Sequence, residues 1–371
     1  MITLFLPITT LFIPPRIHRL RGWSSPSSFY RPTRRCMTTA QSQNEDPTTT
    51  VLFERDISQE VQGLYRFLEE QECEGMESLA IGWALTKSDD DSDSTRLRGL
   101  FATDNFATGE FLFAIPHPAT LLVQEKIIDA HDINHDTDNS DEEEEYNDEG
   151  MKQAVALLGN FFAESTWEPY IKCLPGVNHT SFDGTPDFWT AKALERFPVP
   201  LLRQRSQERF QRIQIESSEK KEFSTKELQW ALWIIRSRGF TSIKQSDGGK
   251  LREQTMLLPL IDMINHDGED PNASIEVIET DSYDESFIAL KARRDITRGE
   301  QITLRYGTGF ETSLELLDKY GFYTRNNPND ERIDWGLVDT EMLEDNCNDE
   351  VDTDLASIYQ FCHLLRQKRP S

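Results

Sequence analysis

The residues whose side chains could best carry out chemistry lie in four short segments between residues 98 and 322. Each segment brings polar or aromatic side chains together at close spacing, and such side chains can orient lone pairs, stabilise developing charge or hold a polar ligand. The segments are Arg98-Gly99-Leu100-Phe101-Ala102, Arg236-Ser237-Arg238-Gly239-Phe240, 259–272 with Asp262, Asn265 and His266, and 299–307 with Tyr306, followed by Tyr320-Gly321-Phe322.

Tyr306 is the most informative of these side chains. Ile302, Leu304 and Tyr306 alternate, so they fall on one face of a predicted strand and the phenol points inwards. There a phenol orients a lone pair or stabilises developing charge, and its ring excludes water. Taken singly, each candidate also has a structural explanation, such as a core aromatic, a turn histidine, a capping Asp262 or an Arg238 that meets the carbonyl ends of a helix. Their combination and order indicate a site.

Strands and helices that could position these segments follow from periodicity and capping signals. Ser224 with Glu227 and Thr312 with Glu315 form predicted capping boxes at helix starts. The predicted helices cover 61–68, most of 151–236, 314–319 and 355–366, and the predicted strands cover 78–85, 111–115, 256–260, 273–278, 287–290 and 302–306. Strands, a helical insert and further strands predict an α+β fold with pairing between distant segments.

An internal echo supports this interpretation. Residues 102–110 (ATDNFATGE) match residues 292–300 (ARRDITRGE), and each copy leads through a Gly-Glu turn into an apolar strand. Two copies are too few for a solenoid. They predict a fold assembled from short strand–turn–strand units that are distant in sequence.

In this order, the four segments resemble the SET-domain methyltransferases. The helical insert and the closing Tyr320-Gly321-Phe322 are similar to the branch of the Rubisco large-subunit lysine methyltransferase and the actin histidine methyltransferase. The resemblance is strongest over residues 236–325 and extends over 55–125. It implies an α+β SET fold of short strands with a knot-like crossing, interrupted by a helical insert.

The resemblance further implies S-adenosyl-L-methionine as the cofactor. Asn265 and His266 match the pair that contacts the cofactor's amino-acid end and adenine, and Phe322 matches the aromatic residue that packs on adenine. Arg98, Gly99 and Leu100 match the cofactor-binding turn, although Leu97 stands where the family often has a first glycine. These six residues are the expected cofactor site.

Three further residues match the family's channel for the acceptor side chain. Tyr306 matches the tyrosine at the channel throat and is the expected catalytic residue, while Arg238 and Asp262 match residues near the substrate nitrogen. A lysine ammonium has a reference pKa of about 10.4, so reaching the neutral amine at pH 7 costs about 4.6 kcal/mol. Desolvation and the neighbouring sulfonium cation lower that pKa. Methyl transfer then needs mainly in-line alignment and no metal.

The resemblance leaves three functions open. Lysine is the expected acceptor, with a protein-histidine methyltransferase of the same family as the alternative. A non-catalytic acidic SET adaptor for basic proteins is the rival of a different class. The five cysteines contain no CxxC pair, so no metal site is expected.

The charge of the chain is strongly negative and uneven. The net charge is -26, and residues 127–150 carry eleven acids with no Lys or Arg, while 337–358 carry eight acids and none. Such a chain lacks the cationic face of nucleic-acid binders and suits a basic protein partner. No segment is long and apolar enough to cross a bilayer.

The predicted organisation has three parts. Residues 1–44 contain no Asp or Glu but six Arg and many Ser and Thr, which is typical of a plastid or mitochondrial targeting leader; the alternative is a disordered tail of a cytoplasmic protein. Residues 54–325 form the SET domain, with an acidic disordered insertion at 127–150, a helical insert at 151–236 and the C-terminal half at 237–325. Residues 326–371 are expected to be a short acidic segment, at most a remnant of a substrate-binding domain.

Overall fold

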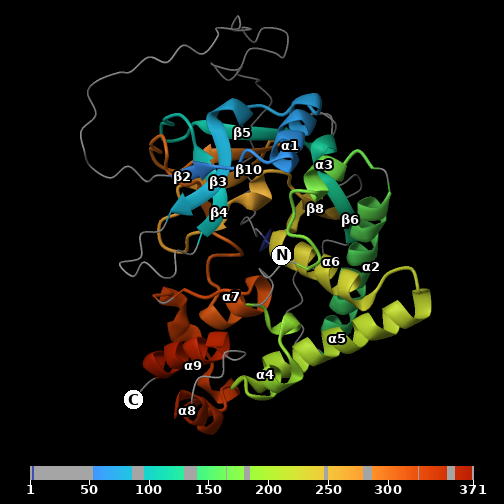
Figure 1. The fold of residues 1–371 in the computed structure, drawn as a ribbon, viewed down its shortest axis with the longest axis vertical. Coiled ribbons are helices and arrows are strands. Elements are labelled where there is room, and N and C mark those ends of the chain that lie inside the picture. The colour runs from blue at the N-terminus through green and yellow to red at the C-terminus, as the bar shows by residue number, and fades with distance from the viewer. Residues whose placement is uncertain are drawn as a thin grey trace, which may run out of the picture. The chain divides into compact units, whose positions relative to one another are not determined.

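The computed structural model describes residues 2–3, 53–85, 96–128, 140–163, 165–178, 184–245, 250–278, 286–324, 326–348 and 356–369. These residues belong to one compact unit of the chain, Met1–Leu4 with Val51–Ser371. The predicted α+β class is confirmed, because small sheets of short strands alternate with helical segments (Figure 1). The other residues of the predicted leader lie outside the described part of the chain.

Four small sheets carry the strands. One has the order β2-β3-β4, from Phe53–Arg55, Leu79–Leu85 and Arg96–Ala102, and a second has the order β10-β11-β5, from Ala273–Ile278, Phe287–Ala292 and Phe111–Pro116. A third has the order β1-β7-β8-β6, from Ile2–Thr3, Phe240–Gln245, Leu251–Leu257 and Leu121–Ile128. The fourth pairs β12 (Thr303–Leu304) with β9 (Asn265–His266).

Two strand predictions need correction. The strand predicted over 256–260 is β8, which begins at Leu251 and ends at Leu257, because Leu260 turns the chain with a positive φ of 74°. The strand predicted over 302–306 is only the two-residue β12. Ile302 and Leu304 are nevertheless buried, as their alternation predicted.

The two segments of the internal echo, 102–110 and 292–300, also lie next to each other in the structure. Gly109 N–H donates to Ala292 O over 2.9 Å, and Gly299 N–H donates to Ala102 O over 2.8 Å. At the centre, Phe106 and Ile296 exchange two backbone hydrogen bonds of 2.9 Å. Both turn glycines have the positive φ that an L side chain rarely adopts, 85° and 89°. The two copies therefore pair with each other in matching register, although they are distant in the sequence.

The helical insert is longer than the sequence indicated. It contains α2 (Ser140–Phe162), α3 (Glu168–Ile171), α4 (Ala191–Glu195), α5 (Pro200–Lys220) and α6 (Thr225–Arg238). Helix α2 begins inside the run that was predicted to be disordered up to residue 150, and 129–139 lie outside the described residues. That prediction was wrong for 140–150, because acidic residues are favourable in the first turns of a helix and this one continues into a buried apolar stretch.

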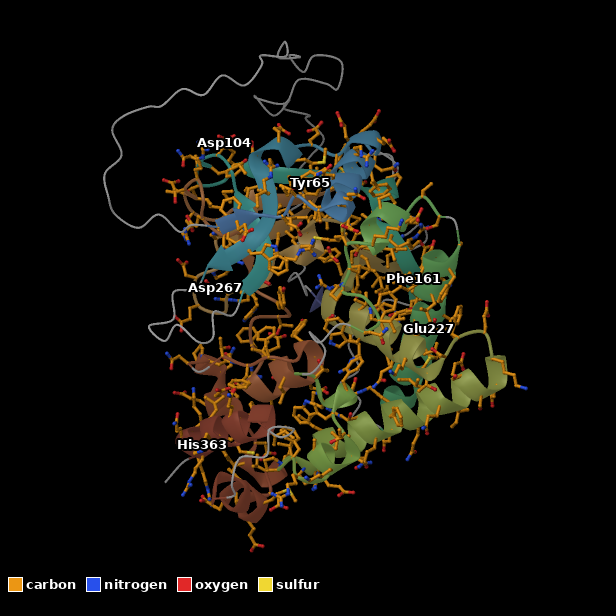
Figure 2. The ribbon with its side chains drawn as sticks, in the orientation of Figure 1. Tyr65, Asp104, Phe161, Glu227, Asp267 and His363 are labelled. Carbon is orange, nitrogen blue, oxygen red and sulfur yellow. The ribbon has the colours of Figure 1, made fainter. Side chains whose placement is uncertain are left out.

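Helix α6 is the centre of the insert. Its capping box is present as predicted, with Ser224 Oγ accepting from Glu227 N–H and the Glu227 carboxylate accepting from Ser224 N–H. Figure 2 labels Glu227 at this end of the helix. Apolar side chains are buried around most of α6, so it packs as a core helix rather than an amphipathic one.

The C-terminal part of the described chain has its own hydrophobic core. Helices α7 (Ser313–Tyr320), α8 (Thr340–Asn348) and α9 (Ala356–Lys368) contribute to it, and α8 and α9 lie side by side (Figure 1). Its buried members are Ala193, Phe197, Val199, Leu202, Leu317, Ile333, Val338, Leu343, Ile358, Phe361, Cys362, Leu364 and Leu365. The helix predicted over 355–366 is confirmed as α9, and the acidic run at 337–358 also contains α8, for which no helix was predicted.

Candidate active site

The candidate site begins where two distant segments cross. Asn265 and His266 of β9 pair in parallel with Thr303 and Leu304 of β12. Asn272 fastens the crossing, because its Nδ2 donates to Gln301 O over 2.8 Å and its Oδ1 accepts from Thr303 N–H over 2.8 Å. Tyr306, two residues beyond β12, is thereby brought against the Asn265-His266 pair.

Tyr306 is held at both ends. Its main-chain N–H donates to His266 Nδ1 over 3.0 Å, and its phenol donates to the main-chain carbonyl of Ile264. Burial raises the pKa of the Tyr306 phenol to about 12, a rise that Asp262 reinforces and Arg238 opposes. The phenol therefore keeps its proton at neutral pH.

Three aromatic rings stand around Tyr306. Ring centroids lie 5.0 Å from Tyr320, 5.2 Å from His266 and 6.2 Å from Phe322, and His266 and Phe322 lie 5.5 Å apart. Burial also lowers the pKa of His266, while Asp267 and Glu311 oppose that effect. The group of Tyr306, Tyr320, Phe322 and His266, called the aromatic wall below, gives the site an aromatic surface and carries a neutral imidazole.

A buried polar triad adjoins Tyr306. Tyr170 of α3 donates from its phenol to Asp262 Oδ2 over 2.7 Å, and Arg238 at the end of α6 donates to the Asp262 carbonyl over 2.6 Å. Burial raises the pKa of Asp262, although Arg238 and Tyr170 both lower it. Asp262 Oδ1 and Arg238 Nε have no hydrogen-bond partner among the described residues. A buried polar atom without a partner is costly unless a ligand meets it, so this pair has capacity for an acceptor group.

The turn predicted at Arg98, Gly99 and Leu100 is instead the middle of strand β4, which contributes main chain rather than side chains to the site. The Arg98 guanidinium turns to Asp56, 3.0 Å away, and to the carbonyl of Cys173, while Leu100 is fully buried. The main-chain carbonyl of Arg98 accepts from Asn265 Nδ2 over 2.8 Å. The main chain of this motif, rather than its side chains, therefore lies next to Asn265.

Gly99 faces two side-chain amides at close range. A Cβ there would lie 2.3 Å from Gln301 Nε2 and 2.7 Å from Asn265 Nδ2. Gln301 Nε2 is buried and has no partner in the described part of the chain. Three features lie together: a cradle at Gly99, which has no side chain, the unpaired amide donor of Gln301 and the aromatic wall. Together they suit a ligand that has both polar and flat aromatic parts.

The described structure thus brings together Asn265, His266, Tyr306, Phe322, Arg238 and Asp262, with the backbone of Gly99 beside them. No role was predicted for Tyr170 or for Gln301. Tyr320 stood in the quoted motif without a role. Its position two residues before Phe322 was the available signal.

A small cavity extends from His266 to the C-terminal segment. Its lining includes His266, Arg305, Glu311, Asn327 and Asn329. The Glu311 carboxylate accepts from Thr308 N–H over 2.7 Å and from Gly309 N–H over 2.8 Å, which shapes the loop after Tyr306. The chain beyond residue 325 therefore forms part of the surroundings of the site.

Within the residues that the structure describes, no group of three or more His, Cys, Asp or Glu side chains is arranged to hold a metal ion. None of the described helices combines the length and apolarity that a membrane crossing requires.

Comparison with known proteins identifies the class. The SET domain family matches residues 97–307, more than half of the chain, and the chain belongs to this family. Two solved structures of the SET domain of LSMT, one bound to lysine and AdoHcy and one to methyllysine and AdoHcy, share the fold with TM-scores of 0.52 and 0.51. Their sequence identities are 16% and 17%, and each match covers 73% of this chain and 58% of the other.

A curated relative is the protein Plastid transcriptionally active 14 of Arabidopsis thaliana. It is 33% identical over 99 residues, which make up 27% of this chain and 20% of the relative. This chain thus spans a fifth of that relative and less than two thirds of the LSMT chains.

Proposed function

We propose that this protein transfers a methyl group from S-adenosylmethionine to the side-chain nitrogen of a lysine in a protein substrate. The observation that carries the proposal is the fixed Tyr306, whose N–H meets His266 and whose phenol meets Ile264 O beside the Tyr170–Asp262–Arg238 triad. The LSMT SET domain, which shares the fold, has been solved with lysine and with AdoHcy.

The residues of the site fit the cofactor. The cradle at Gly99, the unpaired Gln301 amide and Asn265 offer close backbone approach and polar groups, and Phe322 offers an aromatic face. Asn265, His266, Phe322 and the backbone of Arg98–Leu100 in β4 would hold it. When bound, S-adenosylmethionine supplies an electrophilic methyl group on a cationic sulfonium.

The side chains on the acceptor side have separate tasks. Tyr306 keeps its proton and its orientation, so its oxygen presents fixed lone pairs at the channel throat. The aromatic wall keeps water away, which lowers the pKa of an entering lysine ammonium and favours the neutral amine. Asp262, with Oδ1 unpaired, orients the acceptor nitrogen and receives its hydrogen bond. Alignment of the amine with the methyl group then supplies much of the rate.

The substrate class and location follow from charge and from the leader. A net charge of -26 suits a basic protein substrate. The acid-free, Arg-rich residues 1–44 and the name of the Arabidopsis relative favour the plastid over the mitochondrion.

The test is transfer of an isotope-labelled methyl group by the full chain to a plastid protein extract, followed by mass spectrometry of the labelled protein. We expect label on lysine, lost with Tyr306→Phe. Label on histidine would overturn the lysine assignment in favour of the alternative acceptor. No label, from a folded protein that also binds no cofactor, would favour the adaptor.

A further inference from the structure

Four charged side chains from four different elements, among them helix α7, form a buried cluster. Asp187 lies on the short helix η6 (Pro186–Phe188), Arg209 on α5, Arg236 on α6 and Asp318 on α7. Their side chains are 8–14% exposed. A buried pair of this kind is weak evidence for stability but a good device for fixing geometry.

Each arginine of this cluster holds both aspartates. Arg209 lies 2.6 Å from Asp187 and 2.8 Å from Asp318, and Arg236 lies 2.5 Å from Asp187 and 3.3 Å from Asp318. Arg236 also donates to the main-chain carbonyl of Asp318 over 3.1 Å. The two arginines outweigh burial and keep the pKa of Asp318 low. The cluster therefore ties the insert segment that contains Asp187 to helix α7.

The insert segment that contains Asp187 also contacts the site directly, because Gly184 packs closely against Gly321. A Cβ on Gly184 would lie 2.1 Å from the carbonyl oxygen of Gly321, and a Cβ on Gly321 would lie 2.4 Å from Thr185 Oγ1. Thr185 is itself fixed, because its Oγ1 accepts from Trp233 Nε1 over 3.0 Å. The backbones of residues 184–185 and 321 thus pack against each other without room for a side chain.

Gly321 stands between two residues of the aromatic wall. It ends α7 with a φ of 78°, and Tyr320 and Phe322 flank it. Any displacement of the 184–188 segment or of α7 therefore moves Tyr320 and Phe322 relative to Tyr306 and His266.

We infer that Asp187, Arg209, Arg236 and Asp318 are positioning residues, which set the aromatic wall by clamping the helical insert to α7 and to Gly321. This inference rests on the proposed function for its catalytic meaning. The cluster touches neither cofactor nor acceptor and acts through Tyr320 and Phe322. Because a misplacement of about 1 Å can cost about 10²-fold in activity, a small shift here suffices to weaken the site.

The test combines a direct probe of Phe322 with cofactor affinity, both in the full chain. Phe322 is replaced by 4-fluorophenylalanine, and its ¹⁹F resonance is recorded with and without Gly184→Ala, Asp318→Asn or Arg209→Lys. Gly184→Ala pushes on Gly321 without altering a charge, and Arg209→Lys keeps the charge but removes the fork that spans both aspartates. Gly159→Ala is the matched control, since nothing lies within 4 Å of a Cβ there.

We expect a shifted or split resonance and a cofactor affinity at least about tenfold weaker in the three variants, with Gly159→Ala unchanged. An unchanged resonance in those variants that keep their circular dichroism spectrum would overturn the inference, whatever their stability. If the unsubstituted chain binds no cofactor, the proposed function fails, while the resonance still decides whether the cluster positions the wall.

Discussion

The main-chain N–H of Tyr306 donates a hydrogen bond to Nδ1 of His266 over 3.0 Å. Because Nδ1 accepts, the neutral imidazole carries its proton on Nε2. A side chain on β9 thus fixes the backbone just beyond β12, and the residue expected to be catalytic depends on an unprotonated histidine.

This dependence predicts a pH effect on stability. Burial lowers the pKa of His266 from its ordinary value of 6.5, so the folded state binds fewer protons than the unfolded state between the lowered pKa and 6.5. The contribution of His266 to the free energy of unfolding is complete above pH 6.5. It is lost as the pH falls through the lowered pKa that His266 has in the folded state. His266→Gln should therefore lose less stability than the unsubstituted protein between about pH 7.5 and about pH 5.5. Urea unfolding at both pH values measures this, with exposed His363 of α9 (Figure 2) changed to Gln as the control.

Gly99→Ala should damage cofactor binding selectively. The added Cβ would meet Gln301 Nε2 at 2.3 Å and Asn265 Nδ2 at 2.7 Å, so both amides must move. We expect affinity for S-adenosylmethionine to fall at least about tenfold, because close backbone approach is lost. Calorimetric titration measures it, and Gly176→Ala, where the Cβ meets nothing within 4 Å, should bind normally. Equal affinity in the two variants would remove Gly99 from the site.

Tyr170→Phe tests the triad. Asp262 Oδ2 then loses the 2.7 Å hydrogen bond from the Tyr170 phenol, and this bond lowers the pKa of Asp262. The pKa of Asp262 should therefore rise, and the acidic limb of the pH–rate profile should move to higher pH. The unfolding free energy should fall by about 1–3 kcal/mol.

Tyr65→Phe is the matched control for that change. Tyr65 of α1 (Gln59–Glu70), labelled in Figure 2, donates from its phenol to Leu79 O over 3.1 Å. This variant should lose stability but keep the wild-type pH–rate profile. A shift of equal size in both variants would show that the profile reports general destabilisation rather than Asp262.

Phe361→Ala tests whether the C-terminal core belongs to the folded unit. Phe361 is fully buried, with ring centroids 5.0 Å from Tyr323 and 5.9 Å from Phe197. Its truncation should cost about 3–5 kcal/mol in urea unfolding. Leu337→Ala, at a position that is 47% exposed, should cost far less. Similar small losses for both would contradict a shared core.

The sequence predicted those parts of the site that are encoded locally. The Thr312–Glu315 capping box begins α7 as expected, and the glycine turns of the echo have their positive φ. Asn265, His266 and Tyr306 could be placed together only through the resemblance, because 40 residues separate His266 from Tyr306 and no periodicity connects them.

Other parts of the site arise from contacts that leave no local pattern. Tyr170 lies 92 positions from Asp262 in the chain, and its pairing depends on how α3 packs. Arg98 resembles a ligand-binding residue, yet Asp56, 42 positions away, captures its side chain. No helix was predicted at α8, which lies in an acidic run, yet Leu343 of α8 is buried in the C-terminal core.

The most direct test of the central claim is calorimetric titration of the full chain with S-adenosylmethionine, repeated with Asn265→Ala and Tyr306→Phe. We expect saturable binding that Asn265→Ala weakens and Tyr306→Phe largely spares, while Tyr306→Phe abolishes methyl transfer. A folded protein that shows no saturable binding would contradict the methyltransferase assignment and leave an acidic SET module that binds basic proteins.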